Sequence, residues 1–468
     1  MARLVDDPET WFKRNLDGTC RILLVNPPVQ EKRYHWLRWN QPMELLCLGT
    51  WLKKAHRGIA VRLEDMMLPD EEGAVPKHKV KDTWGNVTDE QLWHFGEPFE
   101  ALGERLARLI QEQWIPDCIV ISSLTSYWHL SVEKLLVKLC MRLGRQLRRR
   151  VKIVLYGNYP RFEPEHAEAQ PDADIAMTRT VRTQGFAPDF ALYLESVKRL
   201  PSFFALDIED DHVYDHLDAC LEFQGAWYKQ RAIARRPTIT VAFFNDDVCS
   251  PRSSLTQVIK FAAKHPSQLL VEGIAGIEPR SLSRPRLEEL KAAGFRSLFV
   301  EHARLPRGIP NVEAYVPLLE MLREEEHRKR SGHANRAWLD GAVTGFVAIG
   351  LPDDEMDALV RSTLVVNSFF KSVILKPYGY SPTVDAATST ERRKRWRDPF
   401  QSSPQWFPYV GHGSALTRSD YENLLRWQNV LNMRVKGTTF DFLGDGNVAK
   451  LVRDTLVAES WKPHSETR

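Results

Sequence analysis

The sequence predicts an α/β protein in which a flavodoxin-like doubly wound domain is followed by a second strand–helix series and a small helical C-terminal region. Two observations predict this fold class. Short apolar runs that end at Pro or Gly recur along the chain, and stretches with helical apolar spacing lie between them. Such alternation requires parallel strands joined by right-handed crossovers. With 468 residues, the chain is long enough for two or three domains.

The composition is that of a globular protein with large cores, since 43% of residues are hydrophobic and 27% are charged. The 64 Lys and Arg nearly balance the 61 Asp and Glu, so no global field favours nucleic acid or an anionic membrane. We therefore expect neither partner. The N-terminus lacks the apolar region of a signal peptide, and no run approaches the ~18 apolar residues of a membrane span. We expect a cytoplasmic protein.

Four apolar strands are predicted in the first domain, over residues 21–26, 59–65, 117–123 and 151–157, with helices over 43–55 and 130–147. In a parallel sheet, ligands bind beyond the carboxyl ends of the strands. The polar, Gly-bearing or Pro-bearing loops at those ends are therefore the candidate binding segments. Their candidate binding residues are Asn26, Pro27, Pro28, Ser122, Ser123, Thr125, Gly157, Asn158, Tyr159 and Thr178.

The motifs ILLVNPP (22–28), LGTWLKKA (48–55), ISSLTS (121–126) and VLYGNYP (154–160) follow one another along the chain. In this order and spacing they resemble the N-terminal domain of cobalamin-binding radical SAM proteins. The resemblance implies a B12-binding-like domain over residues 1–195 that holds cobalamin base-off, and no DxHxxG motif for a histidine ligand occurs. Two loops depart from the family, with Tyr156 in place of a glycine and 177–180 in place of an acidic loop. The alternative is a doubly wound domain whose crevice holds no ligand.

The second half of the chain also resembles this family. The strand from 238 to 247 ends in Phe-x-Asp-Asp, the turn at 349–354 reads Ile-Gly-Leu-Pro-Asp-Asp, and Glu301 stands at the end of another strand. The resemblance implies a degenerate radical-SAM-like partial (β/α) barrel over residues 237–385. Residues 196–236 then form a linker in place of the cluster loop. Residues 386–468 form a loop and helical C-terminal region, with helices over 419–435 and 445–456.

Six cysteines are scattered at 20, 47, 118, 140, 220 and 249, and no CxxxCxxC motif occurs. Three thiolates must converge to hold a [4Fe–4S] cluster and leave one iron for SAM. Between residues 196 and 236, where the resemblance places the cluster loop, the only cysteine is Cys220. We therefore expect neither an iron–sulfur cluster nor SAM binding.

Two other groups of residues suggest different chemistry. His212 and His216 are one helical turn apart and flanked by aspartates, a pattern that suits zinc, iron or manganese, although an exposed acidic linker produces the same string. Asp246, Asp247 and Glu301 are candidate catalytic carboxylates at strand ends. The aspartate pair has an alternative role as the cap of the following helix.

Three functions follow from these features. The first is a corrinoid-binding accessory subunit of a companion enzyme in a biosynthetic pathway, a radical-SAM-like pseudoenzyme. The second is a cluster-free enzyme that uses cobalamin or another metal for group transfer or rearrangement of a small metabolite. The third is a sensor of a small-molecule ligand, which requires only the first domain. Whether the chain is an enzyme stays open at this point.

Overall fold

In the computed structural model the chain forms two compact units. The first holds the described residues of Met1–Ala242 and Lys260–Leu270, and the second those of Phe243–Ile259, Val271–Tyr378 and Phe407–Arg468. The described residues are 1–31, 41–72, 74–80, 92–123, 131–182, 186–194, 197–201, 203–243, 247–273, 277–301, 315–332, 338, 343–350, 354–370, 372–377 and 416–433.

The first unit contains a parallel six-stranded sheet in the order β1-β9-β8-β7-β2-β4. Its strands are β1 (Arg3–Val5), β2 (Arg21–Asn26), β4 (Ala60–Asp65), β7 (Cys118–Ser122), β8 (Lys152–Tyr156) and β9 (Ile175–Met177). Apart from β1, which is added at the far edge, the order is that of a flavodoxin-like sheet. The α/β fold class predicted from the sequence is confirmed.

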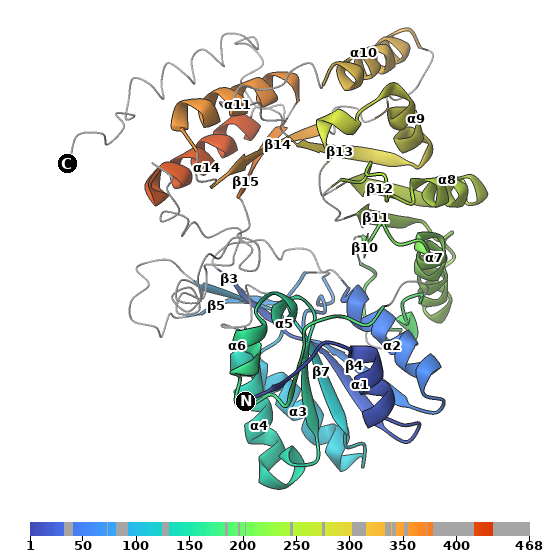
Figure 1. Ribbon diagram of the computed structural model, residues 1–468. Coiled ribbons are helices and arrows are strands. Elements are labelled where there is room, and N and C mark those ends of the chain that lie inside the picture. The colour runs from blue at the N-terminus through green and yellow to red at the C-terminus, as the bar shows by residue number, and fades with distance from the viewer. Residues whose placement is uncertain are drawn as a thin grey trace, which may run out of the picture. The chain divides into compact units, whose positions relative to one another are not determined.

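Helices cover both faces of this sheet, because alternate residues of each strand point to opposite faces (Figure 1). On β2, Ile22 and Leu24 pack with α1 (Pro8–Asn15) and α2 (Met43–Ala55). Leu23 and Val25 pack on the other face with α3 (Phe99–Gln111) and α4 (Glu133–Arg148). The short helices α5 (Asn158–Phe162) and α6 (Pro164–Glu168) follow β8. Burial on both faces explains why the interiors of β2, β7 and β8 are continuously apolar.

A small antiparallel sheet of β3 (Val29–Glu31), β6 (Leu92–Phe95) and β5 (Lys77–Val80) was not predicted. It begins directly after Pro27 and Pro28, which end β2. The Gln30 amide donates to Ser131 Oγ at 3.0 Å, and Gln30 Nε2 lies 3.2 Å from His94 Nδ1. The first contact joins β3 to the segment just before α4, and the second joins β3 to β6.

The second sheet has the order β10-β11-β12-β13-β14-β15, which is also the chain order. Registers are parallel for β12–β13, β13–β14 and β14–β15. Its strands are β10 (Phe204–Leu206), β11 (Ile239–Phe243), β12 (Leu269–Gly273), β13 (Phe295–Glu301), β14 (Val343–Ile349) and β15 (Ser372–Pro377). Five helices alternate with them: α7 (Val213–Gln230), α8 (Leu255–Lys264), α9 (Arg284–Ala292), α10 (Val316–Arg330) and α11 (Met356–Phe369). This is the strand–helix succession of a partial (β/α) barrel.

The segment 196–236, which the sequence suggested to be a linker, contains β10 and the 18-residue helix α7. It therefore supplies the first strand–helix pair of the second sheet. The apolar residues of α7, including Val213, Leu217 and Cys220, recur at helical spacing and are buried. Charged residues around them in the sequence hide this pattern.

The helix α14 (Arg418–Met433), expected over 419–435, covers the outer edge of β15. Asn432 Oδ1 accepts from the Val373 amide at 3.0 Å, and Asn432 Nδ2 donates to the Val373 carbonyl at 2.8 Å. Gln428 Oε1 accepts from the Leu375 amide at 2.6 Å. Side-chain amides of α14 thus bond to the backbone of β15, which is the last strand of the sheet among the described residues, and protect this edge from other chains. The helix expected over 445–456 lies outside the described residues.

In the described part of the chain, no helix combines the length and the hydropathy needed to cross a membrane.

Replacing Asn432 with Ala should lower the free energy of unfolding by about 1–3 kcal/mol, because two hydrogen bonds to Val373 are lost at once. Asn423→Ala is the matched control, since Asn423 is exposed on the same helix. Chemical denaturation followed by circular dichroism measures both variants. Equal stability of the two variants would show that the amides do not cap β15.

Candidate functional site

The switch point of the first sheet lies between β2 and β7, where the strand order reverses, and ligands of doubly wound sheets bind at such points. The parallel strands bring the predicted binding residues to one edge. Asn26, Pro27 and Pro28 stand at the end of β2, Ser122 and Ser123 at the end of β7, Gly157, Asn158 and Tyr159 after β8, and Thr178 after β9. Thr125 lies outside the described residues.

Glu44, in the first turn of α2, also reaches this edge and was not predicted. Ser122 Oγ donates to Glu44 Oε2 at 3.1 Å. Burial raises the pKa of the Glu44 carboxyl, while the Ser122 hydrogen bond and the Arg161 charge act in the opposite direction. An acidic residue in a first helical turn is common, because it complements the helix dipole, so its sequence position carried no special signal.

Gly157 makes the close approach of these strand ends possible. Its φ is +88°, and a Cβ there would lie 2.8 Å from Ser122 Oγ and 3.0 Å from Glu44 Oε2. The Tyr159 amide donates to the Ser123 carbonyl at 3.0 Å, and the Ser123 amide donates to the Tyr156 carbonyl at 3.2 Å. Only glycine meets both the backbone and the space requirement at this position.

Three residues near the edge have their side chains in other contacts. Tyr156 packs on the face covered by α1 and α2, and its hydroxyl accepts from the Val181 amide at 3.0 Å. Tyr159 packs in the opposite core, with its hydroxyl 2.6 Å from His166 Nδ1. The Thr178 hydroxyl hydrogen-bonds to Asp6, next to β1. The backbone after β8, rather than the Tyr159 ring, therefore belongs to the candidate site.

Asp65, at the end of β4, is a second residue near this edge that was not predicted from the sequence. Asn26 Nδ2 donates to Asp65 Oδ1 at 2.6 Å, and the Tyr193 hydroxyl donates to Asp65 Oδ2 at 2.6 Å. The Met67 amide also donates to Asp65 Oδ1, at 2.9 Å. Asp65, only 2% exposed, thus fixes the end of β4 against the end of β2.

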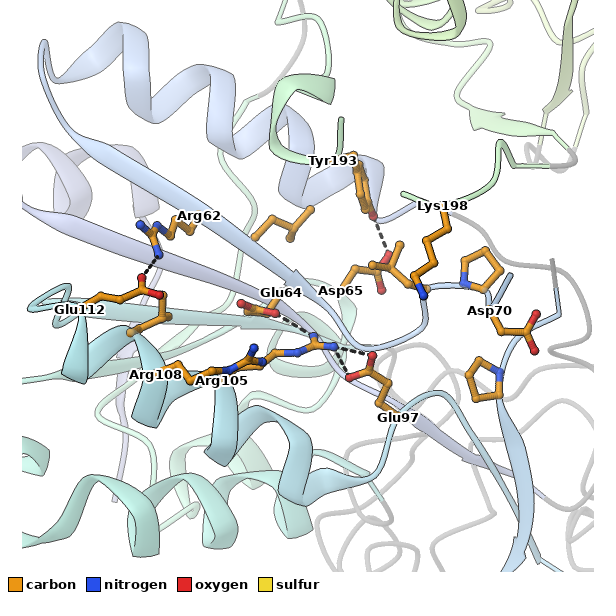
Figure 2. Close-up of a pocket in the computed structure, with 15 residues that line it drawn as sticks. Arg62, Glu64, Asp65, Asp70, Glu97, Arg105, Arg108, Glu112, Tyr193 and Lys198 are labelled. Carbon is orange, nitrogen blue, oxygen red and sulfur yellow. Dashed lines mark hydrogen bonds and ion pairs between the residues drawn. The ribbon is translucent and has the colours of Figure 1, made fainter. Parts of the chain in front are cut away.

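A cavity of about 540 Å³ lies beside β4 on the far side from β2 (Figure 2). Arg105 of α3 contacts Glu64 at 2.8 Å and also pairs with Glu97. Arg62 lies 3.4 Å from Glu112. The lining residues are Arg62, Leu63, Glu64, Asp65, Leu68, Pro69, Asp70, Pro76, Glu97, Arg105, Arg108, Leu109, Glu112, Tyr193 and Lys198. No local sequence pattern singles out this cavity, because its lining residues come from separate segments.

The two histidines proposed as metal ligands have different surroundings. His212 is half exposed at the start of α7, with Nδ1 3.3 Å from Asp215 Oδ2. His216 is buried, with Nε2 3.8 Å from Asp210 Oδ2. Within the described ranges, no group of three or more His, Cys, Asp or Glu is arranged to hold a metal ion.

Of the proposed catalytic residues, Asp246 lies outside the described residues. Asp247, after β11, accepts from the Cys249 amide at 2.9 Å and from Ser281 Oγ at 2.9 Å. Glu301 ends β13, and its carbonyl accepts from the Tyr315 hydroxyl at 3.2 Å. Strand β12 lies between β11 and β13 in the sheet. The bond from the Cys249 amide is that of a local turn, and the bond from Ser281 ties this turn to a distant segment of the chain.

All six cysteines lie among the described residues, as free thiols on separate segments. Residues 207–212, between β10 and α7, contain no cysteine. Cys220 is buried in α7, and burial raises its pKa well above the usual range. Burial likewise raises the pKa of Cys47 to about 12.

No protein-family model and no curated protein sequence matches the chain. The solved structures that resemble it in fold include two of one enzyme. One is the radical S-adenosylmethionine methyltransferase TsrM from Kitasatospora setae with tryptophan and a SAM analog bound, with a TM-score of 0.45 and 10% identity over 78% of this chain and 75% of that chain. The other is TsrM with cobalamin and a [4Fe-4S] cluster bound, with a TM-score of 0.44 and 11% identity over 78% of this chain and 74% of that chain.

Glu44→Gln should stabilise the protein increasingly as the pH rises above 4.5. A carboxyl whose pKa is raised on folding favours the folded state below its unfolded pKa, and that contribution is lost as the pH rises through the folded pKa. Gln has a neutral amide that does not ionise, so the stability of the variant does not fall in this way as the pH rises. Denaturant unfolding between pH 4 and pH 8 measures the difference from wild type.

The control for this series is Glu100→Gln. The hydrogen bond from Lys138 lowers the pKa of the exposed Glu100, so this variant should lose a small amount of stability at higher pH instead. A Glu44→Gln difference that shrinks as the pH rises contradicts the raised pKa.

Proposed function

We propose that this chain binds a corrinoid at the carboxyl edge of its first sheet and serves as a cluster-free partner subunit of a cobalamin-dependent enzyme. The coincidence of two independent features carries the proposal. The loops 26–28 and 122–123, which carry the resemblance to cobalamin-binding radical SAM proteins, flank the switch point of a flavodoxin-like sheet. The switch point is where such sheets bind ligands with long polar tails.

The residues at this edge fit the chemistry of a corrinoid tail, which carries amide, hydroxyl and phosphate groups. Ser122 and Ser123 offer hydroxyls, and Asn158 offers an amide. Glu44 accepts a hydrogen bond when ionised and also donates one when protonated, and its raised pKa favours the protonated form. Gly157 allows a ligand to approach the backbone closely. When bound, the corrinoid supplies a cobalt centre that carries or transfers an alkyl group.

The surroundings of His94 support a corrinoid held without a histidine ligand. Its Nδ1 lies 3.2 Å from Gln30 Nε2, and its Nε2 lies 2.7 Å from the Glu97 carbonyl. Burial lowers the pKa of His94 to about 4, so the ring is neutral at physiological pH. Both ring nitrogens of His94, which lies on β6 beside β3, are therefore engaged by protein groups.

The placement of the cysteines supports the cluster-free part of the proposal. A [4Fe–4S] cluster that binds SAM needs three thiolates on one loop, and residues 207–212 contain none. Cys220, the nearest cysteine, has its thiol buried and held protonated by its raised pKa. A thiol in that state is a poor metal ligand.

A cluster-free enzyme that uses the second sheet is the alternative function. It depends on Asp246, Asp247 and Glu301 as catalytic carboxylates. The two carboxylate oxygens of Asp247 already accept bonds from Cys249 and Ser281. These bonds favour a role for Asp247 in the turn after β11, and so favour the accessory function.

The test is to incubate the full chain with hydroxocobalamin, remove unbound ligand by gel filtration and record the absorption spectrum together with cobalt and iron content. We expect a corrinoid spectrum with stoichiometric cobalt and no iron. Gly157→Ala should weaken binding about tenfold, because the new Cβ separates Ser122 from Glu44.

Gly144→Ala is the matched control for this experiment. Gly144 also has a positive φ, of +63°, but a Cβ there meets no atom within 4 Å. It therefore introduces similar backbone strain away from the site and should leave binding unchanged. The proposal is overturned if the wild-type chain retains no cobalt. It is also overturned if the isolated chain forms 5′-deoxyadenosine from SAM.

A further inference from the structure

Among the strands that the structure describes, β4 stands at the edge of its sheet and pairs with β2 alone. The Ala60 amide donates to the Cys20 carbonyl at 3.0 Å, and the Met66 amide donates to the Asn26 carbonyl at 3.0 Å. In a parallel strand, the backbone groups of alternate residues bond to the same neighbour. The backbone amides and carbonyls of residues 60, 62, 64 and 66 therefore point toward β2. The backbone groups of Val61 and Leu63 face the opposite side, and no bond to them is formed by the described residues.

The cavity of Figure 2 runs along this open side of β4. Four consecutive residues of the strand line it, from Arg62 to Asp65. Helix α3 borders it through Arg105 and Leu109, and Tyr193 and Lys198 border it elsewhere. A strand edge with unpaired backbone groups beside an open cavity is a template for the addition of another strand.

The sequence of the strand is complementary to itself when two copies run antiparallel. With the two-fold axis at Leu63, the Leu63 amides and carbonyls of the two copies exchange hydrogen bonds. This register places Arg62 of each copy opposite Glu64 of the other. Opposite charges at facing positions stabilise antiparallel pairs, and like charges destabilise them.

The charges around Glu64 favour an added cation. Arg105 is shared by Glu64 and Glu97, so one guanidinium faces two carboxylates. Burial raises the pKa of Glu64, against the effect of Arg105 and, more weakly, of the exposed Arg108. A second arginine at Glu64 would balance the pair of carboxylates.

Arg62 is available for this role. Its contact with Glu112 is 3.4 Å long, and both side chains are about half exposed, at 45% and 61%. Exposed ion pairs of this kind contribute about 0–1 kcal/mol, so little is lost when Arg62 changes partner. The Arg62 guanidinium also lies over the Trp114 ring, 4.7 Å from its centroid, which keeps it beside β4.

We propose that β4 is the interface of a homodimer, in which two copies pair antiparallel about Leu63 and exchange Arg62–Glu64 ion pairs. The two first sheets then form one continuous sheet. This inference does not depend on corrinoid binding, because the carboxyl-edge residues Ser122 and Gly157 lie outside β4, at the end of β7 and after β8.

Size-exclusion chromatography with light scattering on the full chain tests the interface. The wild type should have twice the chain mass of 54.0 kDa at micromolar concentration. Arg62→Glu should give the single-chain mass. In the proposed register the new glutamate of each copy faces Glu64 of the other copy, so like charges repel at both ends of the pair.

Two further variants separate dimer loss from unfolding. Leu63→Pro should also give the single-chain mass, because it removes an amide that faces away from β2, while the β2–β4 ladder keeps its bonds. Arg108→Glu is the matched charge control, since Arg108 lines the same cavity from α3, and it should remain dimeric. Circular dichroism confirms that each variant is folded.

A monomeric wild type overturns the proposal and leaves the β4 edge to a strand of another protein or to a small ligand. A dimer that survives both Arg62→Glu and Leu63→Pro overturns it as well, because a different surface must then hold the two copies together.

Discussion

The pairing of β2 with β4 on one side and with β7 on the other is the constraint on which the candidate site depends. All three strands run in the same direction, so their polar ends meet at one edge. The strand order reverses at β2. The segments that follow β2 and β7 therefore lead to opposite sides of the sheet and leave a crevice between them. Because both faces of β2 and β7 are buried under helices, polar residues such as Ser122 occur only where these two strands end.

Close packing at this edge depends on a single glycine. Gly157 brings the end of β8 against Ser122 and Glu44, a contact that no side chain at position 157 would permit. Its positive φ also turns the backbone, so that the Tyr159 amide reaches the Ser123 carbonyl. The same edge thus combines a close backbone approach, hydroxyl groups and a carboxyl with a raised pKa, which together suit a ligand rich in amide and phosphate groups.

The sequence was sufficient to predict the first sheet, because strands buried on both faces are continuously apolar and end at Pro or Gly. It was insufficient for β10 and α7, since the acidic residues at 207–218 mask the helical spacing of Val213, Leu217 and Cys220. Glu44 and Asp65 were missed for another reason. Their importance comes from contacts with Ser122 and Tyr193, which are distant in the sequence, and no local pattern reports such contacts.

The most direct measurement of the central claim is electron paramagnetic resonance of the protein after loading with cobalamin and reduction to Co(II). A corrinoid held at the carboxyl edge without a histidine ligand should give a cobalt spectrum that lacks splitting from an axial nitrogen, and this spectrum should persist after gel filtration. A nitrogen-split spectrum from the protein-bound cobalt, or a protein fraction with no cobalt signal, would contradict the account.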